Sequence, residues 1–333
     1  METIQRRIKG LIVGCGKIAG YFDQDQVQHP SKVYSYAEAM QLSSFLELEA
    51  CVDLVEEKAK KIADQYKIPY TFTDYIIAIK ELNPKFVIVA TPDQTHFKIT
   101  REILLSSDCP ELIIVEKPLC LSLPELEELR RLAHKKATQL IINQSRRFNV
   151  RFKVLKEQIA KEEYGAPFRL DFYTYGDWKK NGIHTIDTLM YLFGKSIKEE
   201  DIRIEAKKIT LKKINWTDVL LRFSDEFIVT INYVPEQFYQ LFEMDFKFEK
   251  GRIHFQDFEQ RLSIEKKTIN TMNENILKLS SNDLPTQEVS NMFGLIQEME
   301  LFFQNKTTLA DYSINAIEKS MKLYFKTIPY YEN

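Results

Sequence analysis

Short apolar runs alternate with amphipathic stretches through the first half of the chain. The amphipathic stretches repeat apolar positions every three or four residues, which is the spacing of one helix face. The runs predicted as strands are Ile8–Val13, Leu46–Val52, Phe86–Ala90, Leu112–Val115 and Leu140–Ile142. The predicted helices are Val55–Tyr66, Asp74–Leu82, His96–Leu105 and Leu123–Ala137. Strands that are apolar throughout and separated by helices indicate a parallel sheet covered on both faces, so this half is predicted to be a doubly wound α/β domain.

The second half of the chain changes to a period of two. Apolar and polar residues alternate over Val219–Phe223 and Phe227–Tyr233, with turn residues Ser224–Glu226 between them, and again over Phe242–Phe248 before a Lys250-Gly251 turn. Such alternation predicts antiparallel hairpins with one solvated face. Two long helical patterns follow, Val289–Gln304 and Asp311–Thr327. This half is predicted to be an α+β domain with an open, largely antiparallel sheet.

Composition and charge exclude several classes of protein. Forty-six Lys and Arg stand against 48 Asp and Glu, a net charge of −2, so no nucleic-acid footprint over the whole protein is expected. No apolar run approaches the roughly 18 residues that a membrane helix needs. The start, Met1–Arg7, has no apolar stretch behind its charges, so no secretory signal is predicted.

The cysteines lack the spacings of a metal site or a disulfide framework. None of Cys15, Cys51, Cys109 and Cys120 forms a CxxC or zinc-type pattern. They are therefore interpreted as reduced, mostly buried thiols of a cytoplasmic protein without a bound metal.

Four of the ten glycines fall within eleven residues near the N-terminus. There, Gly10–Gly20 is a strand running into the pattern GxGxxA. Gly14 would allow a sharp turn, Gly16 would let a pyrophosphate approach the backbone, and Ala19 would let the following helix pack close to the sheet. The N-terminus of that helix would present its amides to the phosphates. The motif predicts dinucleotide binding by Gly14, Cys15, Gly16, Lys17 and Ile18.

An acidic residue closes the second predicted strand. Asp53 could accept hydrogen bonds from both ribose hydroxyls of NAD, and no Arg follows it directly to receive a 2′-phosphate, so NAD is favoured over NADP. Asp53 lies 39 residues after Gly14, where about 20 is usual. The excess is explained by a polar insert, Tyr21–Ser31. The alternative is a glycine turn in an α/β domain that binds no dinucleotide.

Three further segments carry a resemblance to a known family. They are Ala90-Thr91-Pro92-Asp93-Gln94-Thr95-His96, Val115-Glu116-Lys117-Pro118-Leu119 and Gly182-Ile183-His184-Thr185-Ile186-Asp187. With the glycine turn, and in this order and spacing, they make nearly the whole chain resemble the Gfo/Idh/MocA oxidoreductases, the glucose–fructose oxidoreductase and inositol dehydrogenase family. The resemblance implies a Rossmann domain, predicted as residues 1–145, and a substrate-binding and oligomerisation domain, residues 146–333. It also implies a substrate cleft between them, and hydride transfer between a sugar-like or polyol C–H and nicotinamide.

The resemblance also implies a role for each matching residue. His184 would exchange the hydroxyl proton, since imidazole titrates near neutral pH. Lys117 would place a cation near the reacting oxygen and the nicotinamide ribose. The remaining cofactor-binding predictions are Thr91 and Pro92 in the loop under the cofactor, Glu116 on the nicotinamide side, and His96. For His96, packing at the start of its helix is the alternative; for Lys117 it is a solvated loop position, and for His184 a capping or core position.

One position departs from the family pattern. Many members carry an Asp four residues before the catalytic His, and here that residue is Lys180. This departure puts an Asp–His dyad in doubt, and Asp187, one helical turn after His184, could orient the imidazole instead. The predicted substrate-binding residues are Lys117, Arg146, Lys180, Asn181, His184 and Asp187. Lys179, Lys180 and Arg146 would make the cleft basic, which favours an anionic substrate such as a nucleotide sugar, a sugar acid or a sugar phosphate.

Two function classes therefore stand at this stage. The first is an NAD-dependent dehydrogenase acting on the CH–OH group of a sugar, sugar acid, polyol or nucleotide sugar. The second is a non-catalytic NAD(P)-binding regulator or scaffold on the same fold, which the loss of the Asp at position 180 keeps open. At least one of Arg146 and Arg147 is predicted to be structural, pairing with a carboxylate between domains. A sheet face left uncovered predicts a homodimer or homotetramer.

Overall fold

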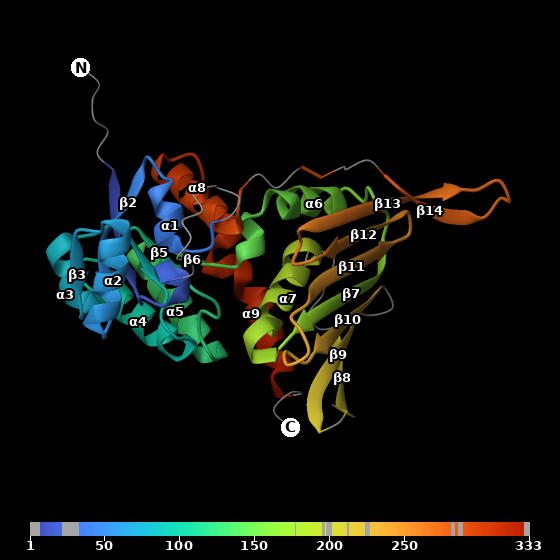
Figure 1. Ribbon diagram of the computed structural model, residues 1–333, viewed down its shortest axis with the longest axis horizontal. Helices are drawn as coiled ribbons and strands as arrows, with labels where there is room; N and C mark the ends of the chain where they lie inside the picture. The colour runs from blue at the N-terminus through green and yellow to red at the C-terminus, as the bar shows by residue number, and fades with distance from the viewer. Residues whose placement is uncertain are drawn as a thin grey trace, which may run out of the picture. The chain divides into compact units, whose positions relative to one another are not determined.

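The protein was analysed as a computed structural model that describes residues 7–21, 33–176, 178–194, 197, 202–211, 213–223, 227–280, 284–285 and 289–329, with only the backbone given at 21, 179, 180 and 211. The chain forms two compact units (Figure 1). One unit comprises Met1–Asn149 with Gln287–Glu318, and the other comprises Val150–Thr286 with Lys319–Asn333. The domain boundary at 145/146 stays a prediction. The two compact units divide at 149/150, and the first unit also includes the later segment Gln287–Glu318.

The first unit is built on a parallel sheet. Within the described ranges this sheet has six strands in the order β3-β2-β1-β4-β5-β6. The strands are β1 (Ile8–Val13), β2 (Leu46–Val52), β3 (Tyr70–Phe72), β4 (Phe86–Val89), β5 (Leu112–Val115) and β6 (Gln139–Ile142). The inner strands β4 and β5 are buried at every residue, as their continuous apolar runs predict for a sheet covered on both faces. The predicted Rossmann architecture is confirmed.

Helices lie around this sheet (Figure 1). They are η1 (Lys17–Tyr21), α1 (Tyr36–Gln41), α2 (Glu56–Tyr66), α3 (Tyr75–Leu82), α4 (Asp93–Leu105), α5 (Leu123–Lys136), η3 (Ser145–Phe148), α8 (Asn291–Phe303) and η5 (Ala310–Tyr312). Side-chain caps fix several of their starts. Asp74 accepts hydrogen bonds from the amides of Ile76 and Ile77, so α3 begins directly after it.

The late segment supplies part of the first unit's core. Phe303 of α8 places its ring 6.1 Å from that of Phe86, and the Phe148 ring stacks on Tyr312 at 4.4 Å. A Cβ at Gly294 would lie only 2.6 Å from the Phe148 carbonyl oxygen, so α8 and η3 are in close contact. The buried apolar residues that the segment contributes are Met292, Leu295, Ile296, Met299, Leu309 and Tyr312.

The second unit is built on a mixed sheet. In the part of the chain that is described, it has eight strands in the order β14-β13-β12-β11-β7-β10-β9-β8. They are β7 (Pro167–Tyr175), β8 (Ile202–Leu211), β9 (Ile214–Phe223), β10 (Phe227–Val234), β11 (Phe242–Phe248), β12 (Gly251–Gln256), β13 (Arg261–Ile269) and β14 (Asn275–Leu279). The predicted pairings β9–β10 and β11–β12 are antiparallel, whereas β7 and β10 pair in parallel. The turn Ser224–Glu226 lies outside the described residues.

One face of the second sheet is covered by helices. Alternating burial along β10 and β12 leaves their apolar residues on one side. On that side lie α6 (Val150–Ala160) and α7 (Trp178–Phe193) (Figure 1). Phe152 of α6 stacks on Phe255 at 5.0 Å, and Phe193 of α7 contacts Phe246 at 5.7 Å. The last helix, α9 (Ile314–Thr327), contains the division between the two units, between Glu318 and Lys319.

Paired charges lie on the same sheet. The Nζ of Lys247 lies 2.6 Å from Asp171 Oδ2 and 2.7 Å from Asp245 Oδ2, and Arg252 Nε donates to Asp245 Oδ1 at 2.7 Å. Burial alone would raise the pKa of both carboxyl groups. Hydrogen bonds outweigh burial and lower both pKa values, at Asp171 from Arg169, Lys247 and Thr230, and at Asp245 from Arg252 and Lys247.

Acid is expected to destabilise the protein partly through these two carboxylates. Folding lowers the pKa values of both carboxyl groups. Their contribution to stability is therefore present above the ordinary pKa of about 3.9 and is lost as pH falls through the pKa values of the folded state. A variant with Asp171→Asn and Asp245→Asn should lose about 1 kcal/mol less unfolding free energy between pH 5 and pH 2 than the wild type. Urea unfolding midpoints across this range measure the difference.

Asp218 provides a control of opposite sign. Burial raises its pKa, so protonation of this group stabilises the fold as pH falls. Asp218→Asn should therefore lose stability more steeply on acidification than the wild type. Parallel pH profiles for all three proteins would contradict the assignment.

Candidate functional site

The predicted site residues of the first half of the chain lie along one edge of the parallel sheet, at the carboxyl ends of five strands. The backbone ladder continues one residue past the strands, with the Gly14 N–H donating to Val52 O at 2.7 Å and the Glu116 N–H to Val89 O at 2.9 Å. Ligands of open α/β sheets bind outside this edge. The residues that follow the strands there are Gly14 after β1, Asp53 after β2, Ala90 and Thr91 after β4, Glu116 and Lys117 after β5, and Asn143 and Gln144 after β6.

The two motif glycines face different surroundings. Gly14 has a φ of +95°, and a Cβ there would lie 2.7 Å from the carbonyl carbon and oxygen of Ala90, so the chain itself requires glycine. At Gly16 a Cβ would meet no protein atom within 4 Å. Open space at this position is what the close approach of a pyrophosphate needs.

The helix expected after Gly16 begins at Lys17. It is a five-residue π-helical turn, Lys17–Tyr21, in the part of the chain described here. Ala19 within it is fully buried, as the motif requires. The rest of the predicted insert, from residue 22 on, lies outside the described residues.

Asp53 has a structural task that the sequence did not reveal. Its Oδ2 accepts a hydrogen bond from the Cys15 N–H at 2.8 Å, and its Oδ1 accepts one from the Val55 N–H at 2.9 Å. The carboxylate therefore fastens the end of β2 to the glycine turn. Each oxygen can accept a second hydrogen bond, so the group fits the ribose hydroxyls of a dinucleotide. Leu54 follows it and is 89% exposed, with no guanidinium at that position.

His96 joins the loops that follow β4 and β5. Its ring is fully buried, with Nδ1 2.7 Å from Pro118 O and Nε2 2.6 Å from Thr91 O. Both ring nitrogens are therefore occupied by backbone carbonyls, which supports the packing alternative for this histidine. Contact of His96 with a cofactor stays a prediction.

Glu116 and Lys117 are half-buried after β5. The Oε1 of Glu116 accepts hydrogen bonds from Tyr36 Oη and Asn143 Nδ2, each at 2.7 Å. No role was predicted for Tyr36 or Asn143 from the sequence, because their link to Glu116 depends on tertiary contacts. The peptide bond between Lys117 and Pro118 is cis.

Arg147 is a buried arginine that binds backbone carbonyl groups. It is 3% exposed, and it donates hydrogen bonds to the backbone carbonyls of Asp311 at 2.7 Å and Ala316 at 3.4 Å. These acceptors lie in the same unit. Pairing of Arg146 or Arg147 with a carboxylate between domains stays a prediction. Arg146 is half-buried in the same 3₁₀ turn, η3. Its binding of substrate stays a prediction.

The predicted residues of the second unit lie on α7. This helix begins at Trp178, so His184 lies inside it. The capping position that the sequence offered as one alternative for His184 is therefore not where this residue lies. His184 is half-buried, Asp187 is 2% exposed, and Asn181 donates from Nδ2 to Tyr175 O at 2.6 Å. The side chain of Lys180 lies outside the described residues.

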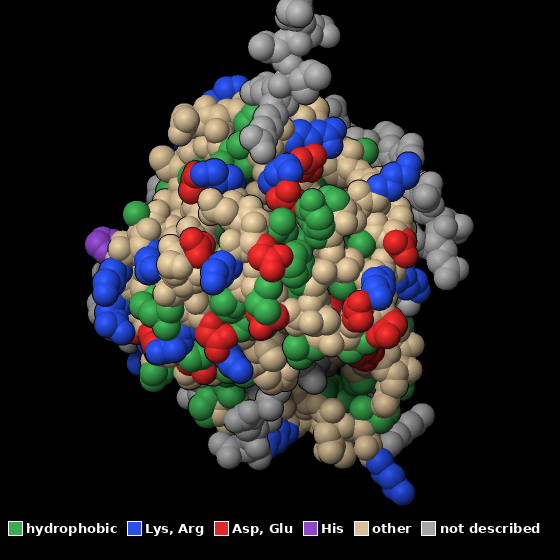
Figure 2. All heavy atoms as spheres, turned by 90° about the vertical axis from the view of Figure 1, so that its left-hand side faces the viewer, with side chains coloured by type: hydrophobic (Ala, Val, Ile, Leu, Met, Phe, Trp, Pro, Cys, Tyr) green, Lys and Arg blue, Asp and Glu red, His purple; other side chains and the backbone are tan. Residues whose placement is uncertain are grey.

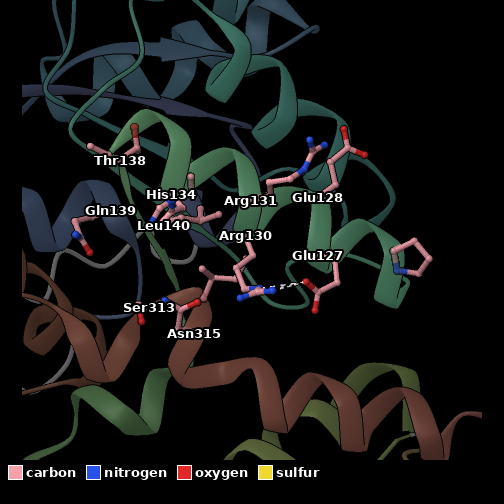
Figure 3. A pocket seen from close by; sticks show the side chains of 14 residues that line it. Glu127, Glu128, Arg130, Arg131, His134, Thr138, Gln139, Leu140, Ser313 and Asn315 are labelled. Carbon is pink, nitrogen blue, oxygen red and sulfur yellow. Dashed lines mark hydrogen bonds and ion pairs between the residues drawn. The ribbon is translucent and has the colours of Figure 1, made fainter.

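A cavity elsewhere in the first unit is separate from these residues. It measures about 1000 Å³ and lies between α5 and the start of α9 (Figure 3). Arg130 points toward Glu127 there and pairs with it at 2.7 Å, with Arg131, His134 and Asn315 nearby (Figure 3). No residue predicted to bind cofactor or substrate lines this cavity.

The four thiols and the surface agree with the composition. All four cysteines are free, with three buried and Cys109 half-buried, and burial raises the pKa of Cys120 to about 12.

Basic and acidic side chains are interspersed on the face shown in Figure 2. No group of three or more His, Cys, Asp and Glu in the described ranges could hold a metal ion. No described helix has the length and apolar character needed to cross a membrane.

The strand order of the first sheet and the glycine turn at its carboxyl edge are those of a dinucleotide-binding Rossmann domain. Residues 8–144 match the model of the Gfo/Idh/MocA oxidoreductase family, described as an NAD-binding Rossmann fold. The matched region is the parallel-sheet part of the chain, which is similar to the Rossmann domain of that family.

Distant relatives include characterised and uncharacterised oxidoreductases. Inositol 2-dehydrogenase 2 of Mycolicibacterium vanbaalenii is 29% identical over 157 residues, covering 44% of this chain and 45% of that protein. The uncharacterized oxidoreductase YrbE of Bacillus subtilis is 23% identical over 168 residues, covering 46% of this chain and 48% of that protein. The chain thus spans about half the length of the curated relatives it matches.

Solved structures match over nearly the whole chain. A putative NADPH-dependent oxidoreductase from Desulfitobacterium hafniense has a TM-score of 0.75 at 16% identity, covering 97% of this chain and 96% of that one. An oxidoreductase from Agrobacterium radiobacter in complex with NAD+, L-tartaric acid and magnesium scores 0.70 at 17% identity, covering 96% and 94%. The WlbA dehydrogenase from Bordetella pertussis in complex with NADH and UDP-GlcNAcA scores 0.70 at 15% identity, covering 96% and 95%. These likenesses show the fold.

Proposed function

We propose that the protein is an NAD-dependent oxidoreductase acting on a secondary alcohol of an anionic, sugar-like substrate. One observation carries the proposal. The turn glycine Gly14, the carboxylate of Asp53 and the Glu116-Lys117 pair stand together at the carboxyl edge of one parallel sheet. A dinucleotide-binding turn and a cation for a reacting oxygen are thereby held on one rigid element.

The cofactor preference follows from Asp53. A second negative charge from a 2′-phosphate beside this carboxylate would be repelled, whereas the two hydroxyls of NAD can donate to it. The residues after Asp53 are Leu54 and Val55, which offer a phosphate no positive charge. Bound nicotinamide supplies the hydride acceptor or donor. The open space at Gly16 suits the pyrophosphate of this cofactor.

Lys117 and His184 divide the remaining chemistry in this proposal. The Lys117 ammonium would hold the substrate oxygen and favour negative charge developing on it. The His184 imidazole would take the hydroxyl proton when the alcohol is oxidised and return it in the opposite direction. Asp187 is the proposed partner that orients this imidazole, in place of the acid that position 180 lacks.

An anionic substrate is proposed from the basic residues Arg146, Lys179 and Lys180. Two structural neighbours support the class. Their structures hold L-tartaric acid and UDP-GlcNAcA, both of which are anions at neutral pH. The neutral alternative is represented by the inositol dehydrogenase among the relatives.

Turnover with a substrate panel tests the function. NADH formation is expected with sugar acids or nucleotide sugars, at a kcat/KM at least about tenfold above that of neutral analogues, because one well-placed ion pair contributes more than about 1.4 kcal/mol. NAD should be preferred over NADP by a similar factor. Better turnover of neutral polyols would refute the anionic class, and a preference for NADP would refute the role of Asp53. Tight NAD binding without turnover of any panel member would favour the regulator.

A further inference from the structure

Three side chains form a closed hydrogen-bonded triangle behind the carboxyl edge of the first sheet. Tyr36 Oη donates to Glu116 Oε1 at 2.7 Å, and Asn143 Nδ2 donates to the same oxygen at 2.7 Å. Asn143 Nδ2 also donates to Tyr36 Oη at 2.9 Å. The three residues come from α1, from the end of β5 and from the end of β6.

The triangle is buried on the side of its two donors. Tyr36 is 0% exposed and Asn143 is 5% exposed, whereas Glu116 is half-buried. Burial, and then the charge of Glu116, raise the pKa of Tyr36 well above its ordinary value, so the phenol stays protonated and remains a donor. Both donors are therefore committed to one carboxylate oxygen.

The second oxygen of Glu116 has no such partner. Oε2 receives no hydrogen bond from the residues that the structure describes, although a carboxylate has acceptor sites on both oxygens. Oε1 is thus held by Tyr36 and Asn143, and Oε2 can accept a hydrogen bond from a donor outside the protein. Glu116 directly precedes Lys117 and lies at the edge where ligands of such sheets bind.

We propose that Tyr36 and Asn143 are positioning residues that fix the Glu116 carboxylate so that its Oε2 accepts a hydrogen bond from the bound dinucleotide. The inference rests on the proposed function only in requiring that the protein binds NAD. A half-buried glutamate that is free to move loses side-chain entropy when it binds a ligand. Hydrogen bonds that fix its carboxylate beforehand reduce this loss. Tyr36 and Asn143 act through Glu116 and touch no substrate themselves.

A double-mutant cycle on cofactor affinity tests the proposal. Kd values for NAD and NADH are measured by calorimetry for the wild type, Tyr36→Phe, Glu116→Ala and the double variant. Glu116→Ala is expected to weaken binding about tenfold, the effect of losing a hydrogen bond to a charged group, and Tyr36→Phe about threefold. Because Tyr36 acts through Glu116, the double variant should bind only as weakly as Glu116→Ala alone.

A merely structural role for Tyr36 predicts a different result. In that case the effects of Tyr36→Phe and Glu116→Ala would multiply to about thirtyfold in the double variant, which would overturn the proposal. Glu116→Gln repeats the cycle with a side chain of the same shape, in case the alanine variant folds poorly, and circular dichroism checks each fold. Asn143→Ala should show the same non-additivity with Glu116.

A matched control is available in the second unit. Tyr164 is also fully buried and donates from its hydroxyl to Gln158 Oε1 at 3.0 Å, far along the chain from the dinucleotide motif. Tyr164→Phe should leave NAD affinity unchanged at a comparable loss of thermal stability. A wild-type protein that binds neither NAD nor NADH would refute the proposed function itself. Normal wild-type binding with an additive cycle would refute only the positioning role.

Discussion

Replacing Lys117 by alanine is expected to lower kcat at least about 100-fold, and replacing His184 by alanine to lower it by a similar factor. Lys117→Ala removes the cation that would stabilise negative charge on the reacting oxygen. His184→Ala removes the group that would exchange the hydroxyl proton. NADH absorbance at saturating NAD and substrate measures both effects, and calorimetry with NAD separates them from lost cofactor binding. His184→Ala should retain the NAD affinity of the wild type.

Surface residues of the same types serve as controls for these two variants. Lys85 is exposed and pairs with Glu111 at 2.6 Å, and His134 is exposed on α5. Lys85→Ala and His134→Ala should have the kcat of the wild type, because neither residue belongs to the proposed site. Both variants should also stay folded, because exposed ion pairs contribute little to stability. If Lys117→Ala or His184→Ala kept full kcat, the catalytic assignment would be wrong. If both lost kcat with NAD affinity intact, the non-catalytic regulator would be excluded.

Alanine at the two motif glycines is expected to separate folding from cofactor binding. Gly14→Ala forces a side chain onto a φ of +95° and within 2.7 Å of the Ala90 backbone, so the thermal midpoint should fall by about 5 °C or more. Gly16→Ala places its methyl group in open space, so the midpoint should stay within about 1 °C of the wild type. The same Gly16→Ala methyl group would occupy the approach of the pyrophosphate and weaken NAD binding about tenfold or more.

Differential scanning calorimetry and NAD titration of both variants measure this contrast. A Gly16→Ala variant with unchanged NAD affinity would contradict the assignment of its open space to the pyrophosphate. Unaltered thermal stability in Gly14→Ala would mean that the turn after β1 relaxes more easily than its contacts with Ala90 indicate.

The strands of the first unit were predictable because each carries its own signal. Ile8–Val13, Leu46–Val52 and Leu112–Val115 were delimited to the residue, because each holds a run of buried apolar residues, and Leu112–Val115 is apolar throughout. Tyr70–Phe72 was missed because it is short and partly exposed. The parallel pairing of β7 with β10 could not be read from the sequence, since strand alternation fixes faces but not neighbours.

The site was predictable where chemistry is encoded locally, and not where it depends on tertiary contacts. The glycine turn was predicted from its spacing and Asp53 from its place at the end of a strand, and the Cys15 N–H of the turn donates to Asp53 in the structure. Tyr36 and Asn143 were not found, because their link to Glu116 spans 80 and 27 residues and follows no motif. At least one of Arg146 and Arg147 was predicted to be structural, and the carbonyl acceptor of Arg147 comes from a segment whose packing no local pattern shows.

The return of Gln287–Glu318 to the first unit has a consequence for how the protein matures at the ribosome. Met292, Leu295, Ile296 and Met299 complete a core that begins with β1, so this core stays open until nearly the whole chain has been synthesised. At about 5–20 residues per second, the nascent first unit spends many seconds with an uncovered apolar surface. The described strands of the second unit all precede residue 280, but this unit also includes Lys319–Asn333, so each unit waits for a segment from late in the chain. The early chain is therefore a natural client for chaperones during that interval.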